Sequence, residues 1–451
     1  MESPGKGHRV FAPVVVATVG AAVAGVLIGA LTRELLPGLF AAFATVGLAI
    51  LLRMVGVRGV AIGFLLFLIP PAVLGEASFF AAEVAVVAIG AMALTYPPAP
   101  RNDQPRVTTL LVLAVVGPAV SMLITGVLTA AVIYVLVAVI LFLAASRPAF
   151  VRDMLRGLTA ILLLLSVSYA VTLIVGFANL PVSSLRIRSR ALELYPPFTL
   201  ATGGPPFIEG SLRFAPLVGE PGLAVFFVVP LLALLLTRGI SRRDRWAVLV
   251  TVLAVTVFSQ SLASGIAIGA ALGVAGLLLL FRERRYVTAI ACTVTVAIIA
   301  PLLLQTLVGW KAVIAPSSVT DRAIFDAGAA TAAGLGDINI LVSLKQNAPH
   351  AVCLLLGLVF ALLVARRSIG GFASWIAFAV VAFFAQPSQW QMGAWLLLSV
   401  GLLPTNARQP DDEIAIARQP HRLHATPRPM PAGRSLSGPA PGGVTGRGDT
   451  A

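Results

Sequence analysis

Apolar runs of nearly membrane-spanning length follow one another along most of the chain, and polar or charged residues gather in the connections between them. A helix needs about 20 mainly apolar residues to cross the hydrocarbon core of a bilayer. The continuous apolar stretch 107–145 is divided at the Gly117–Pro118 and Thr125–Gly126 breaks. The pattern then predicts fourteen helices, at approximately 11–32, 35–52, 58–75, 78–96, 107–124, 126–145, 157–178, 222–238, 246–262, 264–281, 286–308, 351–366, 371–386 and 388–403.

The predicted fold is therefore all-α, that of a polytopic integral membrane protein. Composition agrees, because 58% of the residues are hydrophobic and 11% are charged, with a mean hydropathy of +0.97. Soluble domains carry about 25% charged residues. Lys6 and Arg9 precede the first apolar run, and this run leads into further predicted spans. We therefore expect a first helix here rather than a removed signal peptide.

Basic residues fall mainly on one predicted side of the membrane, as they do in cytoplasmic loops. With the N-terminus inside, 18 of the 32 Lys and Arg residues lie at the N-terminus or in inner connections, eight lie outside and six lie in the C-terminal tail. This distribution predicts that both termini are cytoplasmic. It also explains the net charge of +14 by topology and argues against nucleic acid as a partner.

Two predicted outer loops are long, at about 179–221 and 309–350, whereas the other outer turns have only a few residues. We assign both loops to a transmembrane domain, 1–403. The remainder, 404–451, is rich in Pro, Gly and Arg and is predicted to be a disordered cytoplasmic tail. The two cysteines lie in apolar segments, and no His/Asp/Glu cluster has metal-ligand spacing, so we expect neither a metal nor a cofactor.

The first long outer loop ends in the run GSLRFAPLVGEPG (210–222), which places Arg213 and Glu220 at the entry to an apolar helix. Charges at a membrane boundary are costly, so each one needs a reason. Arginine suits a phosphate because its planar fork donates two parallel hydrogen bonds. Glu220 precedes Pro221 and can cap the helix that follows. It can equally serve as a base or as an acceptor for a sugar hydroxyl, and both roles can hold together.

Further outer-side candidates fall into three groups. Arg186, Arg188 and Arg190 alternate in the first loop, either as phosphate ligands or as anchors on lipid headgroups, and Ser189–Leu194 is predicted to form a short interfacial helix. The second loop carries Arg322, Lys345 and His350, and we place His350 at a helix start in that loop, as an exposed side chain. Gln260 belongs to a serine-rich helix end, where such residues often only join helices together.

Residues 157–403 resemble the O-antigen ligase/polymerase family of bacterial membrane enzymes. The resemblance rests on an R-F-x5-E-P stretch (Arg213, Phe214, Glu220, Pro221) that enters a helix, then RGISRRDR (238–245), then a helix ending in FSQSLASG (258–265) and a second large outer loop. Many relatives have arginine where this chain has Gln260. The Asp-x-x-x-His-Asn context common among ligases is missing, which favours a polymerase.

The resemblance implies glycosyl transfer at the outer face of the bacterial cytoplasmic membrane, from a polyprenyl-diphosphate-linked glycan and without nucleotide sugar, metal or cofactor. Arg213 and Arg322 would neutralise the departing diphosphate. Glu220 or His350 would orient or deprotonate the attacking hydroxyl. Arg186, Arg188, Arg190, Lys345 and Gln260 would bind substrate. Membrane lipids are expected partners, as is a chain-length regulator or another polysaccharide-assembly protein.

Two other classes of protein remain open. A flippase for lipid-linked oligosaccharides would handle the same substrates, but transporters usually show internal repeats and helices broken at the midplane. We find no such repeat, and two outer loops of this length are unusual for a transporter. A non-catalytic membrane partner that organises an envelope complex would not depend on Arg213 or Glu220.

Overall fold

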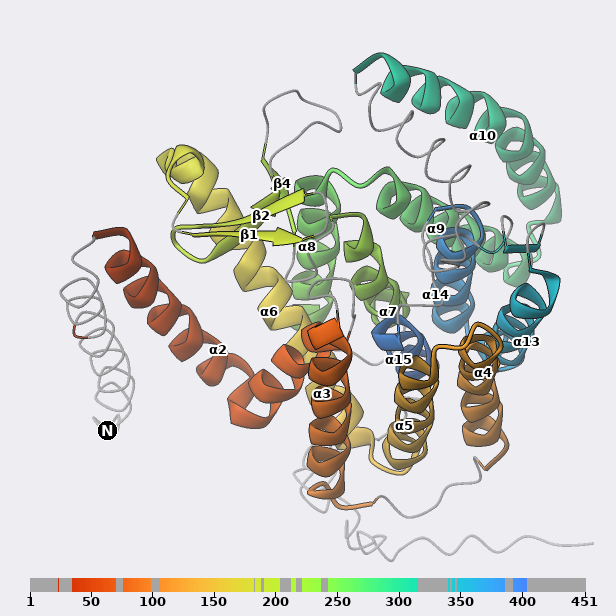
Figure 1. The fold of residues 1–451 in the computed structure, drawn as a ribbon. Helices are drawn as coiled ribbons and strands as arrows, with labels where there is room; N and C mark the ends of the chain where they lie inside the picture. Colours follow the sequence, from red (N-terminus) through yellow and green to blue (C-terminus); the bar gives the residue numbers. More distant parts are fainter. Residues whose placement is uncertain are drawn as a thin grey trace, which may run out of the picture. The chain divides into compact units, whose positions relative to one another are not determined.

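The computed structural model describes Val23, 35–69, 76–98, 105–181, 183–187, 190–202, 212–215, 221–236, 242–314, 340, 343–344, 347–385 and 392–403. Its α-helices (Figure 1) are α2 (Leu35–Leu68), α3 (Glu76–Leu94), α4 (Pro105–Ile124), α5 (Leu128–Ala145), α6 (Pro148–Val175), α7 (Val225–Leu236), α8 (Arg242–Ser259), α9 (Leu262–Arg282), α10 (Tyr286–Ile314), α13 (Ala348–Ala365), α14 (Ile369–Val380) and α15 (Met392–Leu402). The described residues in each predicted range from 35–52 onward are mainly helical. The first range, 11–32, and the tail 404–451 lie outside the described residues, apart from Val23.

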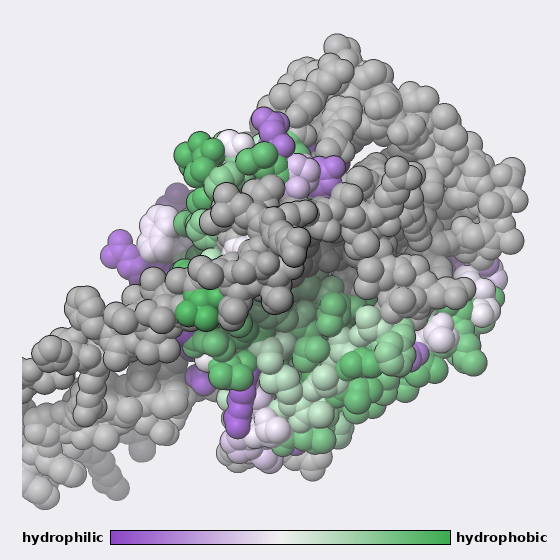
Figure 2. Space-filling model, turned by 60° about the vertical axis from the view of Figure 1, so that its left-hand side comes forward, coloured by the Kyte–Doolittle hydropathy of each residue, from purple (hydrophilic) through white to green (hydrophobic). Residues whose placement is uncertain are grey.

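The helices expose apolar side chains to an extent that soluble proteins avoid. Ile174 on α6 is 84% exposed and Val287 on α10 is 82% exposed. Figure 2 shows hydrophobic residues over a broad part of one face, with hydrophilic residues at its margins. Six helices in the described part of the chain are long and apolar enough to cross a membrane. The chain is therefore a multi-pass membrane protein, and the number of fourteen spans stays a prediction.

Glycines bend or separate the helices at Gly56 and Gly126, whereas the break predicted at Gly117–Pro118 is wrong. Gly56 interrupts α2 with φ 74° and ψ 170°, a conformation open to glycine, so the predicted helices 35–52 and 58–75 are the two arms of one kinked element. Gly126 has φ 78° and separates α4 from α5. Pro118, by contrast, lies inside α4 without ending it.

Close helix packing depends on glycines that face one another. Gly59 and Gly63 of α2 lie against Gly157 of α6, and a Cβ added at Gly157 would collide with the Gly59 carbonyl oxygen. Gly117 of α4 and Gly357 of α13 meet in the same way, since a Cβ at Gly357 would lie 2.6 Å from the Ala114 carbonyl oxygen. Small residues let membrane helices approach this closely, and the packing contacts then hold the helices together.

The first long loop, which is predicted to lie outside, contains a small antiparallel sheet within an otherwise helical fold. Its strands are β1 (Ser183–Ile187), β2 (Arg190–Tyr195), β3 (Thr199–Thr202) and β4 (Arg213–Phe214), in the order β1-β2-β3-β4. The predicted helix at Ser189–Leu194 is wrong, because 190–194 pairs with β1 as a strand. The sequence from Ser184 to Tyr195 alternates apolar and polar residues for much of its length, and this period of two belongs to a strand.

Hydrogen bonds from α6 hold this sheet in place. The Thr172 hydroxyl donates to the Pro196 carbonyl oxygen at 2.7 Å, and the Phe198 N–H donates to the Ser168 hydroxyl oxygen at 3.1 Å. The Thr199 hydroxyl lies 2.8 Å from the Ser168 hydroxyl. Since Ser168, Thr172 and Thr199 are buried, these partners satisfy polar groups that would otherwise be costly inside the protein.

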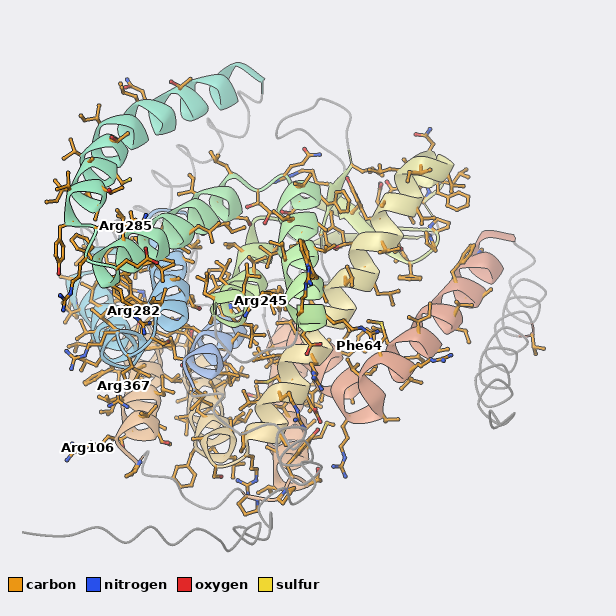
Figure 3. All side chains as sticks on the ribbon, turned by 180° about the vertical axis from the view of Figure 1, so that it is seen from behind. Phe64, Arg106, Arg245, Arg282, Arg285 and Arg367 are labelled. Carbon is orange, nitrogen blue, oxygen red and sulfur yellow. The ribbon has the colours of Figure 1, made fainter. Side chains whose placement is uncertain are left out.

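Arginines predicted for the inner connections lie at helix ends (Figure 3). Arg106 is in the first turn of α4, Arg245 is in the first turn of α8, and Arg282 ends α9. Arg285 precedes α10, and Arg367 lies between α13 and α14. These positions fit a topology in which basic residues mark the cytoplasmic ends of spans.

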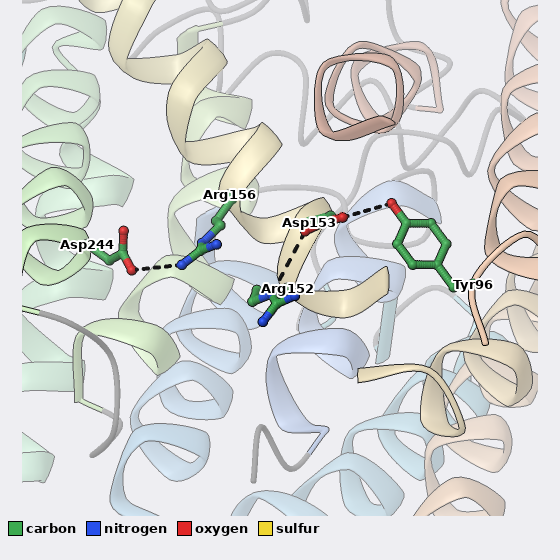
Figure 4. A network of polar contacts seen from close by, with 5 residues as sticks. All are labelled: Tyr96, Arg152, Asp153, Arg156 and Asp244. Carbon is green, nitrogen blue, oxygen red and sulfur yellow. Dashed lines mark hydrogen bonds and ion pairs between the residues drawn. The ribbon is translucent and has the colours of Figure 1, made fainter. Parts of the chain in front are cut away.

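A polar network links α3, α6 and α8 on the predicted inner side (Figure 4). Tyr96, two residues past the end of α3, donates a hydrogen bond to Asp153 Oδ2 at 3.0 Å. Arg152 Nε lies 3.9 Å from Asp153 Oδ1, and Arg156 Nη2 lies 3.2 Å from Asp244 Oδ2. Exposed pairs of this kind contribute about 0–1 kcal/mol each, so they orient the helices more than they stabilise them.

Alkaline titration tests this network. Burial and the hydrogen bond to the Asp153 carboxylate raise the pKa of Tyr96 to about 12. The folded protein holds the phenol proton more tightly than the unfolded chain, so stability falls as pH rises from about 10 to about 12. In Asp153→Asn the pKa of Tyr96 is expected to fall but to stay above 10, because burial is the larger cause. Tyrosinate absorbance as a function of pH measures the pKa of Tyr96, and the absorbance change lost in Tyr96→Phe identifies its signal. An unchanged Tyr96 pKa in Asp153→Asn would contradict the hydrogen bond to Asp153.

Candidate functional site

Arg213 lies where the first long loop meets the end of α8. It begins β4, and its backbone is paired with Thr202 of β3. Its guanidinium Nη2 donates to the Ser259 carbonyl oxygen at 3.4 Å. Ser259 is the last residue of α8, so one arginine joins the loop sheet to the serine-rich helix end. The sequence pointed to both stretches separately, and the structure brings them together.

Gln260 forms the turn between α8 and α9 in a left-handed conformation, with φ 49°. A non-glycine residue held in such a conformation costs about 1–3 kcal/mol, and such residues often cluster at functional sites. Its amide Nε2 lies 3.5 Å from the Leu212 carbonyl oxygen, next to Arg213. The predicted substrate residue Gln260 therefore lies beside the predicted catalytic residue Arg213.

Tyr169 of α6 completes the junction, and sequence analysis did not select it. Its hydroxyl donates to the Leu212 carbonyl oxygen at 2.5 Å. Its ring contacts Phe214 and Phe258, with centroids 5.5 Å and 5.0 Å away. The available signal was a tyrosine within an apolar helix, because a buried tyrosine hydroxyl usually needs a polar partner.

The hydroxyl groups of Ser259 and Ser261, in the stretch 258–265, have structural partners. The Ser261 side chain caps α9 by accepting a hydrogen bond from the Ser264 N–H at 3.3 Å. The Ser259 hydroxyl donates back to the Thr256 carbonyl oxygen at 3.3 Å. These bonds satisfy the ends of two helices and hold the turn rigidly beside Arg213.

His350 is buried, so the prediction of an exposed histidine in the outer loop is wrong. It lies in the first turn of α13, and its backbone N–H donates to the Asn347 side-chain oxygen at 3.2 Å. Its Nδ1 contacts the hydroxyl of Ser121 on α4, and the Ser121 carbonyl oxygen is 3.3 Å away. The partner lies 229 positions earlier in the chain, which is why no local pattern revealed the burial.

His350 and its partners Ser121 and Asn347 pack among other helices than Arg213, Gln260 and Tyr169 do. The principal neighbours of α13 are α4, α14 and α15, whereas β4 contacts α8 and β3. Arg186 and Arg190 lie in paired strands β1 and β2, and only their backbones are described. Three other arginine and lysine candidates and the carboxylate candidate lie outside the described residues: Arg188, Arg322, Lys345 and Glu220.

Metal ligands do not gather in the described part of the chain: no three His, Cys, Asp or Glu side chains lie together there. Cys292 is exposed on α10 and Cys353 is partly buried on α13, and both are free thiols. The arrangement around Arg213 brings a cation, an amide and a phenol to one helix turn, where each donates a hydrogen bond to a backbone carbonyl oxygen.

Comparison of the chain with protein-family models, curated proteins and solved structures finds no match. The fold is that of a multi-pass membrane protein with a small antiparallel sheet in one of its long loops.

Proposed function

We propose that this protein is a membrane glycosyltransferase that polymerises or transfers polyprenyl-diphosphate-linked oligosaccharide units at the outer face of a bacterial cytoplasmic membrane. One observation carries the proposal: Arg213 bonds to the end of α8 beside Gln260, so the two stretches on which the family resemblance rests form one junction. A cation held by neighbouring backbone at the base of a loop is suited to a phosphate at the bilayer surface.

The proposed reaction needs only groups that the chain and its substrates supply. The acceptor hydroxyl oxygen attacks the anomeric carbon of the donor glycan, and the bond from that carbon to the diphosphate oxygen breaks. The diphosphate leaves with the bonding electrons, and Arg213 stabilises its charge. A base takes the hydroxyl proton as the new glycosidic bond forms.

Glu220 is the better candidate for this base. It lies seven residues after Arg213 in the chain, at the entry to the segment that leads into α7. His350 lies in the α4–α13 contact, and its Nδ1 is engaged by Ser121. The proposed topology has fourteen spans, cytoplasmic termini and two long outer loops. The proposed partner is a chain-length regulator or another polysaccharide-assembly protein.

A reconstitution experiment tests the proposal. Purified protein in vesicles is given a polyprenyl-diphosphate-linked oligosaccharide, and both product length and lipid movement across the bilayer are followed. We expect longer glycans or glycan moved to an acceptor, with release of polyprenyl diphosphate. Movement of intact lipid-linked glycan across the bilayer without any transfer would contradict the enzyme proposal and favour a flippase. Absence of both activities would favour a non-catalytic partner.

A further inference from the structure

A cavity lies at the predicted inner end of α7 and α8, and none of the residues of the proposed site lines it. Its volume is about 440 Å³, and it is lined by Leu235, Arg242, Arg245, Trp246 and Leu249. Four of these residues come from α8 at spacings of three, four and seven, which place them on one face of the helix. Leu235, near the end of α7, forms the opposite wall.

The lining combines two kinds of chemistry. Arg242 and Arg245 bring two exposed guanidinium groups, while the leucines on both helices are apolar. Trp246 is 56% exposed at the helix end. Tryptophan is enriched where a span meets the headgroup layer, since its ring is apolar and its N–H is polar. The cavity lining therefore combines cationic and apolar side chains, as a site for a lipid headgroup requires.

The nearest carboxylate on α8 is engaged with another helix. Asp244 bonds to Arg156 of α6 at 3.2 Å, and this pair is drawn in the network of Figure 4. The sequence adds Arg238 and Arg243 to the same connection. Residues 238–245 hold four arginines and one aspartate, so the local charge is positive and complements the anionic lipids of the cytoplasmic leaflet.

We propose that this cavity binds the phosphate of an anionic phospholipid of the inner leaflet. The two guanidinium groups take the phosphate oxygens, because arginine donates paired hydrogen bonds and stays charged. Leu235 and Leu249 contact the start of the acyl chains, and Trp246 lies along the headgroup layer. A basic pocket between helices on the cytoplasmic side is a known form of lipid site. The inference is independent of the glycosyl transfer proposed above and uses none of its residues.

Lipid binding to the purified full-length chain tests the proposal. The probe is phosphatidylglycerol, with phosphatidylcholine as the uncharged comparison, and retained lipid is counted by native mass spectrometry. We expect the double variant Arg242→Gln/Arg245→Gln to bind phosphatidylglycerol about 30-fold more weakly. A variant that fills the cavity without changing charge, Leu249→Trp, should weaken binding as well.

The matched control removes the same charge elsewhere. Arg282 and Arg285 are exposed at the α9–α10 turn, away from the cavity lining (Figure 3), and Arg282→Gln/Arg285→Gln should leave binding unchanged. An equal loss in both double variants would overturn the proposal, because it would show unspecific attraction to basic residues. Full competition by soluble glycerol phosphate would also overturn it, by assigning the cavity to free phosphate. Thermal unfolding without added lipid checks that every variant is folded.

Discussion

Replacing Gly157 by alanine is expected to destabilise the protein by about 3 kcal/mol, because the new methyl group has no room. A Cβ at this position would meet the Gly59 carbonyl oxygen and lie 2.9 Å from the Gly59 carbonyl carbon. Both are backbone atoms of α2, so the only relief is to move α2 away from α6. That movement would break the packing along the whole pair and disturb the helix that carries the loop sheet.

Two further glycines make this a graded series. At Gly63 an added Cβ would lie 2.5 Å from Ile161 Cδ1, the movable tip of a side chain, and 3.0 Å from the Gly157 carbonyl carbon. Because this backbone approach is less close than the one at Gly157, Gly63→Ala is expected to cost less than Gly157→Ala. A Cβ added at Gly269 in α9 would have no atom of another element within 4 Å. Gly269→Ala is therefore the matched control and should keep wild-type stability. Thermal unfolding in detergent measures all three. Equal midpoints for Gly157→Ala and Gly269→Ala would contradict the close approach of α2 and α6.

Replacing Arg213 by alanine is expected to lower glycan transfer about 100- to 1,000-fold, the typical effect of removing one charge-stabilising donor from an active site. Arg213→Lys should recover only part of the activity, because an ammonium group retains the charge but cannot donate the paired bonds of a guanidinium. Initial rates with the lipid-linked substrate measure both variants. Since the same side chain bonds to Ser259, the assay needs a check on folding.

Tyr169→Phe supplies that check. It removes the hydrogen bond to the Leu212 carbonyl oxygen but leaves the charge of Arg213 in place, so it should cost about 1 kcal/mol of stability and little transfer. Arg285→Ala removes an exposed arginine paired with Glu283 at 3.3 Å and should keep both stability and activity. Equal losses of transfer in Arg213→Ala and Tyr169→Phe would mean that Arg213 only joins the loop to α8, and would contradict its role in the reaction.

The candidate site was only partly predictable. Arg213 and Gln260 were selected from separate stretches, and their proximity depends on the way β4 packs on α8. Tyr169 was missed because its polar partner comes from a loop 43 positions away. The expectation for His350 failed for the same reason, since Ser121 buries it from a distant helix. A side chain at a loop boundary looks exposed until the packing partner is known.

By itself, the sequence determined that this is a multi-pass membrane protein and approximately where most of its helices lie, although α6 begins at Pro148 rather than 157 and α10 ends at Ile314 rather than 308. Span length, apolar composition and the placement of arginines are local properties, and each acts through contact with the bilayer or water. Only the tertiary structure decided which glycines touch, which loop forms a sheet, and which distant residues meet at Arg213. These features depend on backbone atoms of separate helices coming within contact distance, and such contacts arise only when the whole chain has folded.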